Sequence, residues 1–197
     1  MILNVLIFFL DLFVFSAFQA WYLLRAEEWN EAHKVIVEKI APDAIINQDY
    51  DYFYGLLKDL QDLPETESCV TNWTTQGQVF YDFITIDLKI CELLEKRDEE
   101  NLAFELENLR GTVLSLCQRI KILPVPNAKS KLCQSEIAKK MAYLTRIVLQ
   151  NSNSGKSSHS EILAQNLAQL PLPDDYMLQE LRTLNRIHMK ELLNQPQ

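Results

Sequence analysis

An apolar seam between residues 102 and 123 is the feature that most constrains how this chain can fold. Its members are separated alternately by four and three residues: Leu102, Leu106, Leu109, Val113, Leu116, Ile120 and Leu123. That spacing places all seven side chains on one face of an α-helix, where they can pack against a neighbouring helix. Pro124 and Pro126 follow and predict the end of the helix. We therefore expect a long helix within a helical assembly.

The same periodicity recurs along most of the chain. It predicts further helices over residues 28–40, 48–63, 73–96, 128–150, 160–170 and 174–194. Pro42 and Pro64 are expected to end the first two, because proline disfavours helix at the residue before it. Residues 65–72 read as a loop and 97–101 as a charged turn, and Asn127 is predicted to cap the helix that follows it. The expected fold class is all-α, an irregular α-solenoid or helical bundle fragment of seven to nine helices.

Each predicted helix has an expected inward face. On residues 73–96 it includes Asp87 and Leu94, and Cys91 and Cys117 are expected to serve as small core hydrophobes. On the last helix the inward residues are expected to be Met177, Leu178, Leu181, Leu184 and Ile187.

Composition narrows the classes of function. The 197 residues include only four glycines, which disfavours an all-β domain rich in tight turns. The net charge is −8, whereas a nucleic-acid-binding protein would carry a basic stripe and a protein on an anionic membrane would carry a basic patch. We therefore expect no nucleic-acid partner and no contact with a membrane surface.

The first 18 residues differ from the rest, since 15 of them are apolar and five of the nine phenylalanines lie there. A membrane anchor needs about 20 apolar residues, and Asp11 in the middle of this segment opposes insertion. A signal peptide needs a basic start, but the first basic residue is Arg25. The two readings we favour are a natural buried helix and the translated end of an intron in a mistaken gene model. Under the second reading, the first helix would show an apolar face with no partner in this chain.

The expected organisation is therefore an apolar head over residues 1–18, a helical segment over 19–150, a flexible Ser/Asn-rich loop over 151–160 and C-terminal helices of the same domain over 161–197. No catalytic, cofactor-binding or metal-binding residues are predicted. The histidines His33, His159 and His188 are far apart and fit no metal motif, and no two of the four cysteines form a C-x-x-C pair. We therefore expect no enzyme, no cofactor and no small-molecule substrate.

Several short segments, taken in order, closely resemble one family. They are AWYLLR at 20–25, WNEAHK at 29–34, DAIIN at 43–47 with YDY at 50–52, LSLCQRI at 114–120, NAK at 127–129, AKKMA at 138–142, LPLPDDY at 170–176 and ELR at 180–182. All resemble the C-terminal end of the ninety-six-type scaffold nucleoporin. In that family the segment belongs to the half released by self-cleavage from a precursor that carries Phe-Gly repeats. The resemblance runs from about residue 19 to residue 193.

The resemblance implies a structural role in the outer ring of the nuclear pore complex, at the nuclear envelope. The family forms a bent α-solenoid in a Y-shaped complex, and its C-terminal end joins other helical nucleoporins at the hub. We accordingly expect those nucleoporins as partners and a contribution to the transport of protein and mRNA. The alternative is a helical adaptor protein anchored in a membrane by residues 1–18.

The residues expected to pack helices or to contact partners are aromatic or belong to apolar seams. Tyr50, Tyr52 and Phe53 form a dense aromatic group, and Tyr52 lies off the inward face, as interface aromatics often do. Packing and partner contact both remain open for this group. The full set is Trp21, Trp29, Tyr50, Tyr52, Phe53, Leu106, Leu109, Val113, Leu116, Tyr176 and Leu181.

Overall fold

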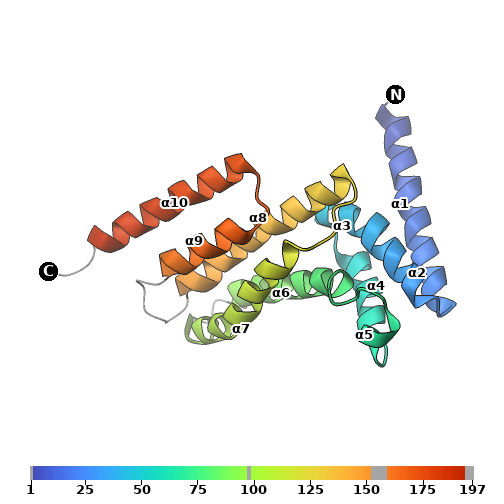
Figure 1. Ribbon diagram of the computed structural model, residues 1–197, viewed down its shortest axis with the longest axis horizontal. Coiled ribbons are helices and arrows are strands. Elements are labelled where there is room, and N and C mark those ends of the chain that lie inside the picture. Colours follow the sequence, from blue (N-terminus) through green and yellow to red (C-terminus); the bar gives the residue numbers. More distant parts are fainter. Residues whose placement is uncertain (1, 97–98, 152–158, 194–197) are drawn as a thin grey trace. The chain divides into compact units, whose positions relative to one another are not determined.

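The computed structural model describes residues 2–96, 99–151 and 159–193, and describes side chains within 14–96, 101–151, 161–186 and at 189. Its helices are α1 (Ile2–Arg25), α2 (Trp29–Val35), η1 (Ile36–Ile40), α3 (Ala41–Asn47), α4 (Asp51–Gln61), α5 (Thr66–Cys69), α6 (Gly77–Lys96), α7 (Glu99–Ile120), α8 (Ala128–Asn151), α9 (His159–Gln169) and α10 (Asp174–Leu193). Figure 1 shows their order along the chain. Over the described ranges there is no strand, and with α2, η1 and α3 counted as one stretch there are nine helices. The predicted all-α class is confirmed.

The chain divides into two compact units. Unit 1 comprises residues 1–85 and 123–136, and unit 2 comprises residues 86–122 and 137–197. In unit 1, α1 lies against α2, η1 and α4 (Figure 1). The core of this unit is built from side chains that the helical periodicity placed inward, among them Ile36, Ile40, Phe53, Leu57, Leu60, Val79, Phe80 and Phe83.

The stretch from α2 to α3 departs from the prediction, because Pro42 does not end the helix. Residues 36–40 form a π-helical turn in which the Ala41 amide donates to the Ile36 carbonyl, five residues back. Pro42 follows in the first turn of α3, where its missing amide is tolerated. The wider turn shifts the hydrogen-bond register just before the proline, so the helix continues to Asn47.

His33 fixes the start of α6. Its buried imidazole accepts a hydrogen bond from the Gly77 amide at Nε2, over 3.2 Å. The ring of Trp73 packs on it with centroids 5.7 Å apart. An amide in the first turn of a helix has no partner inside that helix, so the imidazole satisfies a donor that would otherwise be buried and unpaired.

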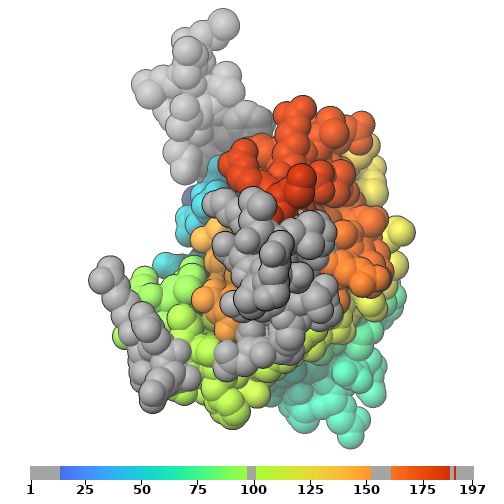
Figure 2. All heavy atoms as spheres, turned by 90° about the vertical axis from the view of Figure 1, so that its left-hand side faces the viewer, coloured from blue at the N-terminus to red at the C-terminus, as the bar shows by residue number. Residues whose placement is uncertain are grey.

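In unit 2, α9 lies against both α7 and α10. Figure 2 faces the side of this unit where α9, in orange, and α10, in red, reach the surface. The predicted seam on α7 is confirmed at its centre, since Leu106, Val113, Leu116 and Ile120 are buried. Within the seam, Leu102 and Leu109 remain half-buried. On α8, Met141, Leu144 and Val148 are buried as expected.

Most predicted helix ends agree with the structure within a few residues. The Asn127 side chain accepts a hydrogen bond from the Ser130 amide at 2.8 Å, which confirms its role as the cap of α8. Two expectations were wrong. The predicted loop over 65–72 contains the short helix α5, and the predicted turn over 97–101 overlaps the start of α7 at Glu99.

Several inward assignments were also wrong. Leu94 is 38% exposed because the neighbouring Leu93 is buried in its place. Leu178 and Leu181 are 55% and 41% exposed, since α10 buries the face that carries Glu180 and Leu184. Cys91 is exposed, whereas Cys117 is buried. Ile187 and most of the predicted loop over 151–160 lie outside the described residues.

Candidate functional site

The aromatic residues predicted in unit 1 occupy two kinds of position. Phe53 is buried and packs edge-on against Phe80, with ring centroids 5.8 Å apart. Tyr50 is half-buried and packs in the same way on Phe83, at 6.1 Å. Tyr52 is exposed, and its hydroxyl donates to the carbonyl of Ala17 over 2.8 Å. Tyr52 therefore both joins α4 to α1 and presents its ring to solvent.

The outer face of α1 is the densest set of exposed large apolar side chains in this unit. Val14, Phe15, Phe18, Trp21 and Tyr22 are exposed, whereas Ser16, Ala20 and Leu24 on the opposite side are buried. Phe18 and Trp21 pack against each other, and the Arg25 guanidinium lies 5.5 Å from the centre of the Trp21 ring. Trp29, at the start of α2, is half-buried.

In unit 2 the predicted residues separate into core and surface. Leu106, Val113 and Leu116 are core residues of α7. Tyr176 is half-buried, and its hydroxyl donates to the Lys139 carbonyl over 3.3 Å, which joins α10 to α8. Leu181 lies on the exposed side of α10 and is available to a partner.

Two buried carboxylates in unit 2 form ion pairs that the sequence did not predict. Glu180 is buried and accepts hydrogen bonds from Arg146 at 2.9 and 3.2 Å, a second link between α10 and α8. Asp87 is buried and pairs with Lys140 at 3.1 Å. Asp87 stood out only as a charge on an apolar stripe, and Glu180 gave no signal because a surface glutamate looks the same in sequence.

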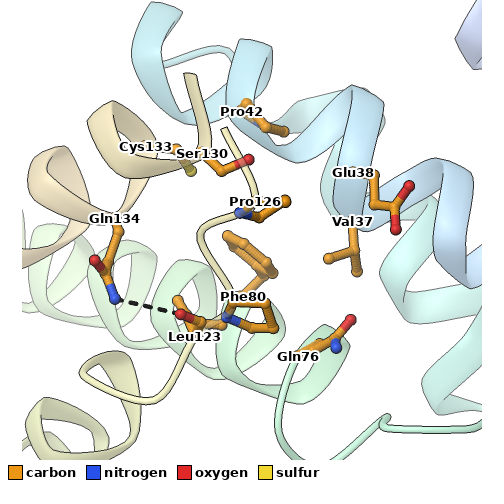
Figure 3. A pocket seen from close by; sticks show the side chains of 11 residues that line it. Val37, Glu38, Pro42, Gln76, Phe80, Leu123, Pro126, Ser130, Cys133 and Gln134 are labelled. Carbon is orange, nitrogen blue, oxygen red and sulfur yellow. Dashed lines mark hydrogen bonds between the residues drawn. The ribbon is translucent and has the colours of Figure 1, made fainter. Parts of the chain in front are cut away.

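A pocket of about 60 Å³ opens in unit 1 beside the π-helical turn. In Figure 3 Phe80 and Pro126 lie near its centre, with Val37 and Glu38 to one side and Gln134 to the other. The lining residues come from η1, α3, the segment before α6, α6 itself, the loop after α7 and α8: Val37, Glu38, Pro42, Gln76, Phe80, Leu123, Pro124, Pro126, Ser130, Cys133 and Gln134. The side-chain amide of Gln134 donates a hydrogen bond from Nε2 to the Leu123 carbonyl over 3.5 Å.

Burial keeps two titratable side chains of unit 1, Cys133 and His33, in their neutral forms. Burial raises the pKa of the Cys133 thiol to about 12, so this side chain in the pocket wall remains a neutral thiol. Burial lowers the pKa of His33 to about 4, which keeps the imidazole neutral and able to accept the Gly77 amide. Among the residues with described side chains, no cluster of three His, Cys, Asp or Glu could hold a metal ion.

The alternative of a membrane anchor finds no support in the described part of the chain. Among the residues with described side chains, which begin at Val14, no helix is long and apolar enough to cross a membrane.

Comparison with known proteins shows that the chain is similar to part of a nuclear pore protein. Over 182 residues the chain is 38% identical to a Drosophila melanogaster protein described as "Nuclear pore complex protein Nup98-Nup96". The matched region covers 91% of this chain and 9% of that protein, so the chain spans less than a tenth of its relative. No protein-family model matches the chain. The resemblance predicted from the short sequence segments is confirmed.

Proposed function

Because the chain is homologous to a segment of a ninety-six-type nucleoporin, we propose that it is a structural segment of the nuclear pore complex. It contributes helical scaffold to the outer ring, at the nuclear envelope, and so supports nucleocytoplasmic transport. The observation that carries the proposal is 38% identity sustained over 182 residues, almost the full length of this helical chain. An all-α fold with exposed apolar helix faces suits such a role.

The proposed partners are other helical nucleoporins of the Y-shaped complex, at its hub. The surfaces proposed for this contact are the outer face of α1 with Trp21, the adjoining Tyr52 of α4, and the exposed side of α10 with Leu181. Aromatic and long aliphatic side chains of this kind dominate the energy of protein interfaces. The proposed role is non-enzymatic and needs no cofactor.

The test is co-purification of the 197-residue chain with the helical nucleoporins of the Y-complex hub. Retention of at least one of them in a stable complex is expected. If a chain shown to be helical by circular dichroism binds neither hub nucleoporin, the assignment to the hub fails. Single alanine substitutions at Trp21, Tyr52 and Leu181 are expected to weaken binding, by up to about 2 kcal/mol at an interface hot spot.

Phe104 and Leu132 provide matched controls, since both are exposed large apolar residues outside the proposed surfaces. Their alanine variants should bind like the unmodified chain. Equal losses in all five variants would indicate non-specific apolar adhesion and would contradict the proposed surfaces.

A further inference from the structure

Three prolines and two glutamines are among the residues that line the pocket beside the π-helical turn. Pro42, Pro124 and Pro126 form part of its wall, and proline contributes a carbonyl but no amide hydrogen. The side-chain amide of Gln134 is already directed at the Leu123 carbonyl (Figure 3). The prolines thus reduce the number of backbone donors in the wall, while the Gln76 side-chain amide also lines it.

The pocket also carries a carboxylate that the rest of the chain leaves unused. Glu38 lines it and is exposed, and within the described residues its carboxylate has no hydrogen-bond or ion-pair partner. Lys129, in the first turn of α8, is paired elsewhere, since its ammonium group lies 2.5 Å from the Asp43 carboxylate. A negative charge therefore remains available at the pocket edge.

The charge of the surrounding unit reinforces this bias. Unit 1 contains 14 acidic and 6 basic residues, a net charge of −8, whereas unit 2 contains 13 of each and is neutral. The whole net charge of the chain thus falls on the unit that contains the pocket. A cationic partner would be attracted to this unit over a distance of about 8 Å at physiological salt.

Size and shape limit what can enter. A pocket of about 60 Å³ is far smaller than the several hundred Å³ of typical cofactor sites, so it suits a single side chain. Its apolar lining includes the Phe80 ring, Val37 and the proline rings. Such a lining fits the aliphatic stem of a long basic side chain, which buries its methylene groups and keeps its charge at the edge.

We propose that this pocket receives the side chain of a lysine or arginine from a partner protein. The aliphatic stem packs on Phe80 and Pro126, and the cationic end faces the Glu38 carboxylate. The inference deepens the proposed function, on which it rests for the existence of a scaffold partner, and names the chemistry by which that partner is recognised.

The experiment titrates the full chain with short capped peptides and follows backbone and side-chain amides by NMR. The peptides are Gly-Ser-X-Ser-Gly, with lysine, arginine, leucine or glutamate at X. At about 10 mM, suited to the millimolar affinity of one side chain, the lysine and arginine peptides are expected to shift the resonances of Val37, Glu38 and Gln134. Equal binding of the leucine or glutamate peptide, or no shift at these residues with any peptide, overturns the proposal.

Two variants of the pocket and one control variant test the site further. E38Q removes the charge at the pocket edge and should weaken the lysine peptide about two- to fivefold, the effect of one exposed ion pair. E31Q removes an exposed glutamate that does not line the pocket and should leave binding unchanged. V37F fills the pocket and should abolish the shifts while the chain remains folded by circular dichroism. Unchanged binding in both E38Q and V37F would refute the site.

The peptide experiment is independent of the proposed nuclear-pore role. If the peptides fail while the chain still co-purifies with hub nucleoporins, the pocket is wrong and the scaffold role stands. If the peptides bind the pocket while no hub nucleoporin is retained, the chemistry of the site stands and the identity of the partner is wrong.

Discussion

At the residue scale, His33 couples folding to pH. Its pKa is lowered by burial to about 4 in the folded chain, whereas an unfolded histidine titrates near 6.5. Between these values the unfolded state binds more protons, so stability is fully present above pH 6.5 and falls as the pH drops towards 4. Urea unfolding should therefore show a loss of about 2 kcal/mol between pH 7 and pH 5 from this residue alone.

The His33 effect can be separated from other titrations with H33Q. Glutamine offers an acceptor to the Gly77 amide without gaining a proton, so the variant should be less stable at pH 7 but should show a flatter pH dependence. Identical slopes in the two proteins would contradict the prediction. An NMR titration of the His33 ring gives its pKa directly.

The glycines offer a second residue-scale test, because their surroundings differ. A Cβ at Gly77 would collide with the Trp73 ring and lie 2.8 Å from His33 Nε2, whereas Gly55 and Gly111 have nothing within 4 Å of that position. G77A should cost about 1–3 kcal/mol of unfolding free energy, since the packed rings must move. G55A and G111A, both inside helices, should stabilise by about 0.5–1 kcal/mol. Thermal and urea unfolding would rank the three variants, and a stabilised G77A would disprove the packing.

At the element scale, the periodicity of apolar residues predicted which segments form helices but not always which face is buried. The α7 seam was assigned correctly at its centre because its apolar residues recur every three or four positions along the helix, although Phe104 lies outside the seam and is exposed. The last helix carries apolar residues on both sides, so Leu178 and Leu181 were placed inward although the structure buries Leu184 and Glu180. The prediction that Pro42 ends its helix was wrong for another reason. A π-helical turn changes the backbone hydrogen-bond register, and no residue type marks it in the sequence.

The attachment of α10 to α8 depends on the Arg146–Glu180 pair. Glu180 is buried and Arg146 is partly exposed, so R146M leaves a carboxylate without its partner in the protein interior. We expect a loss of about 1–3 kcal/mol, below the value for a fully buried pair because solvent reaches the arginine. Hydrogen exchange in α10 should rise.

The Lys96–Glu92 pair is the exposed comparison for R146M, since it joins two positions of α6 four residues apart and lies in solvent. K96M should leave both stability and exchange unchanged, because solvent screens an exposed pair. Similar losses in R146M and K96M would show that burial of Glu180 does not matter.

At the scale of the whole molecule, the helical class and the resemblance to a nucleoporin segment could both be predicted, because each depends on patterns that are local in sequence. The pocket could not be predicted, since it combines Val37, Phe80 and Gln134 from segments far apart along the chain. The uneven division of charge could be read from the sequence. Residues 1–85 contain 13 acidic and 4 basic residues, and the addition of residues 123–136 gives unit 1 its net charge of −8.

The N-terminal segment gives the last prediction at this scale. Removing residues 1–18 deletes the exposed Val14, Phe15 and Phe18 but keeps Ala20 and Leu24, which are buried on the other face of α1. The shortened chain should therefore fold and be more soluble, because a large part of its exposed apolar surface is gone.

The deletion should lower the free energy of unfolding only slightly. The deletion removes the hydrogen bond from Tyr52 to Ala17, worth about 1 kcal/mol, and Y52F in the full chain removes the same bond without the deletion. Circular dichroism and thermal melting of both variants should show similar small losses of stability. A much lower melting temperature for the shortened chain than for Y52F, together with a loss of helicity outside α1, would mean that the apolar head is an integral part of the core of unit 1.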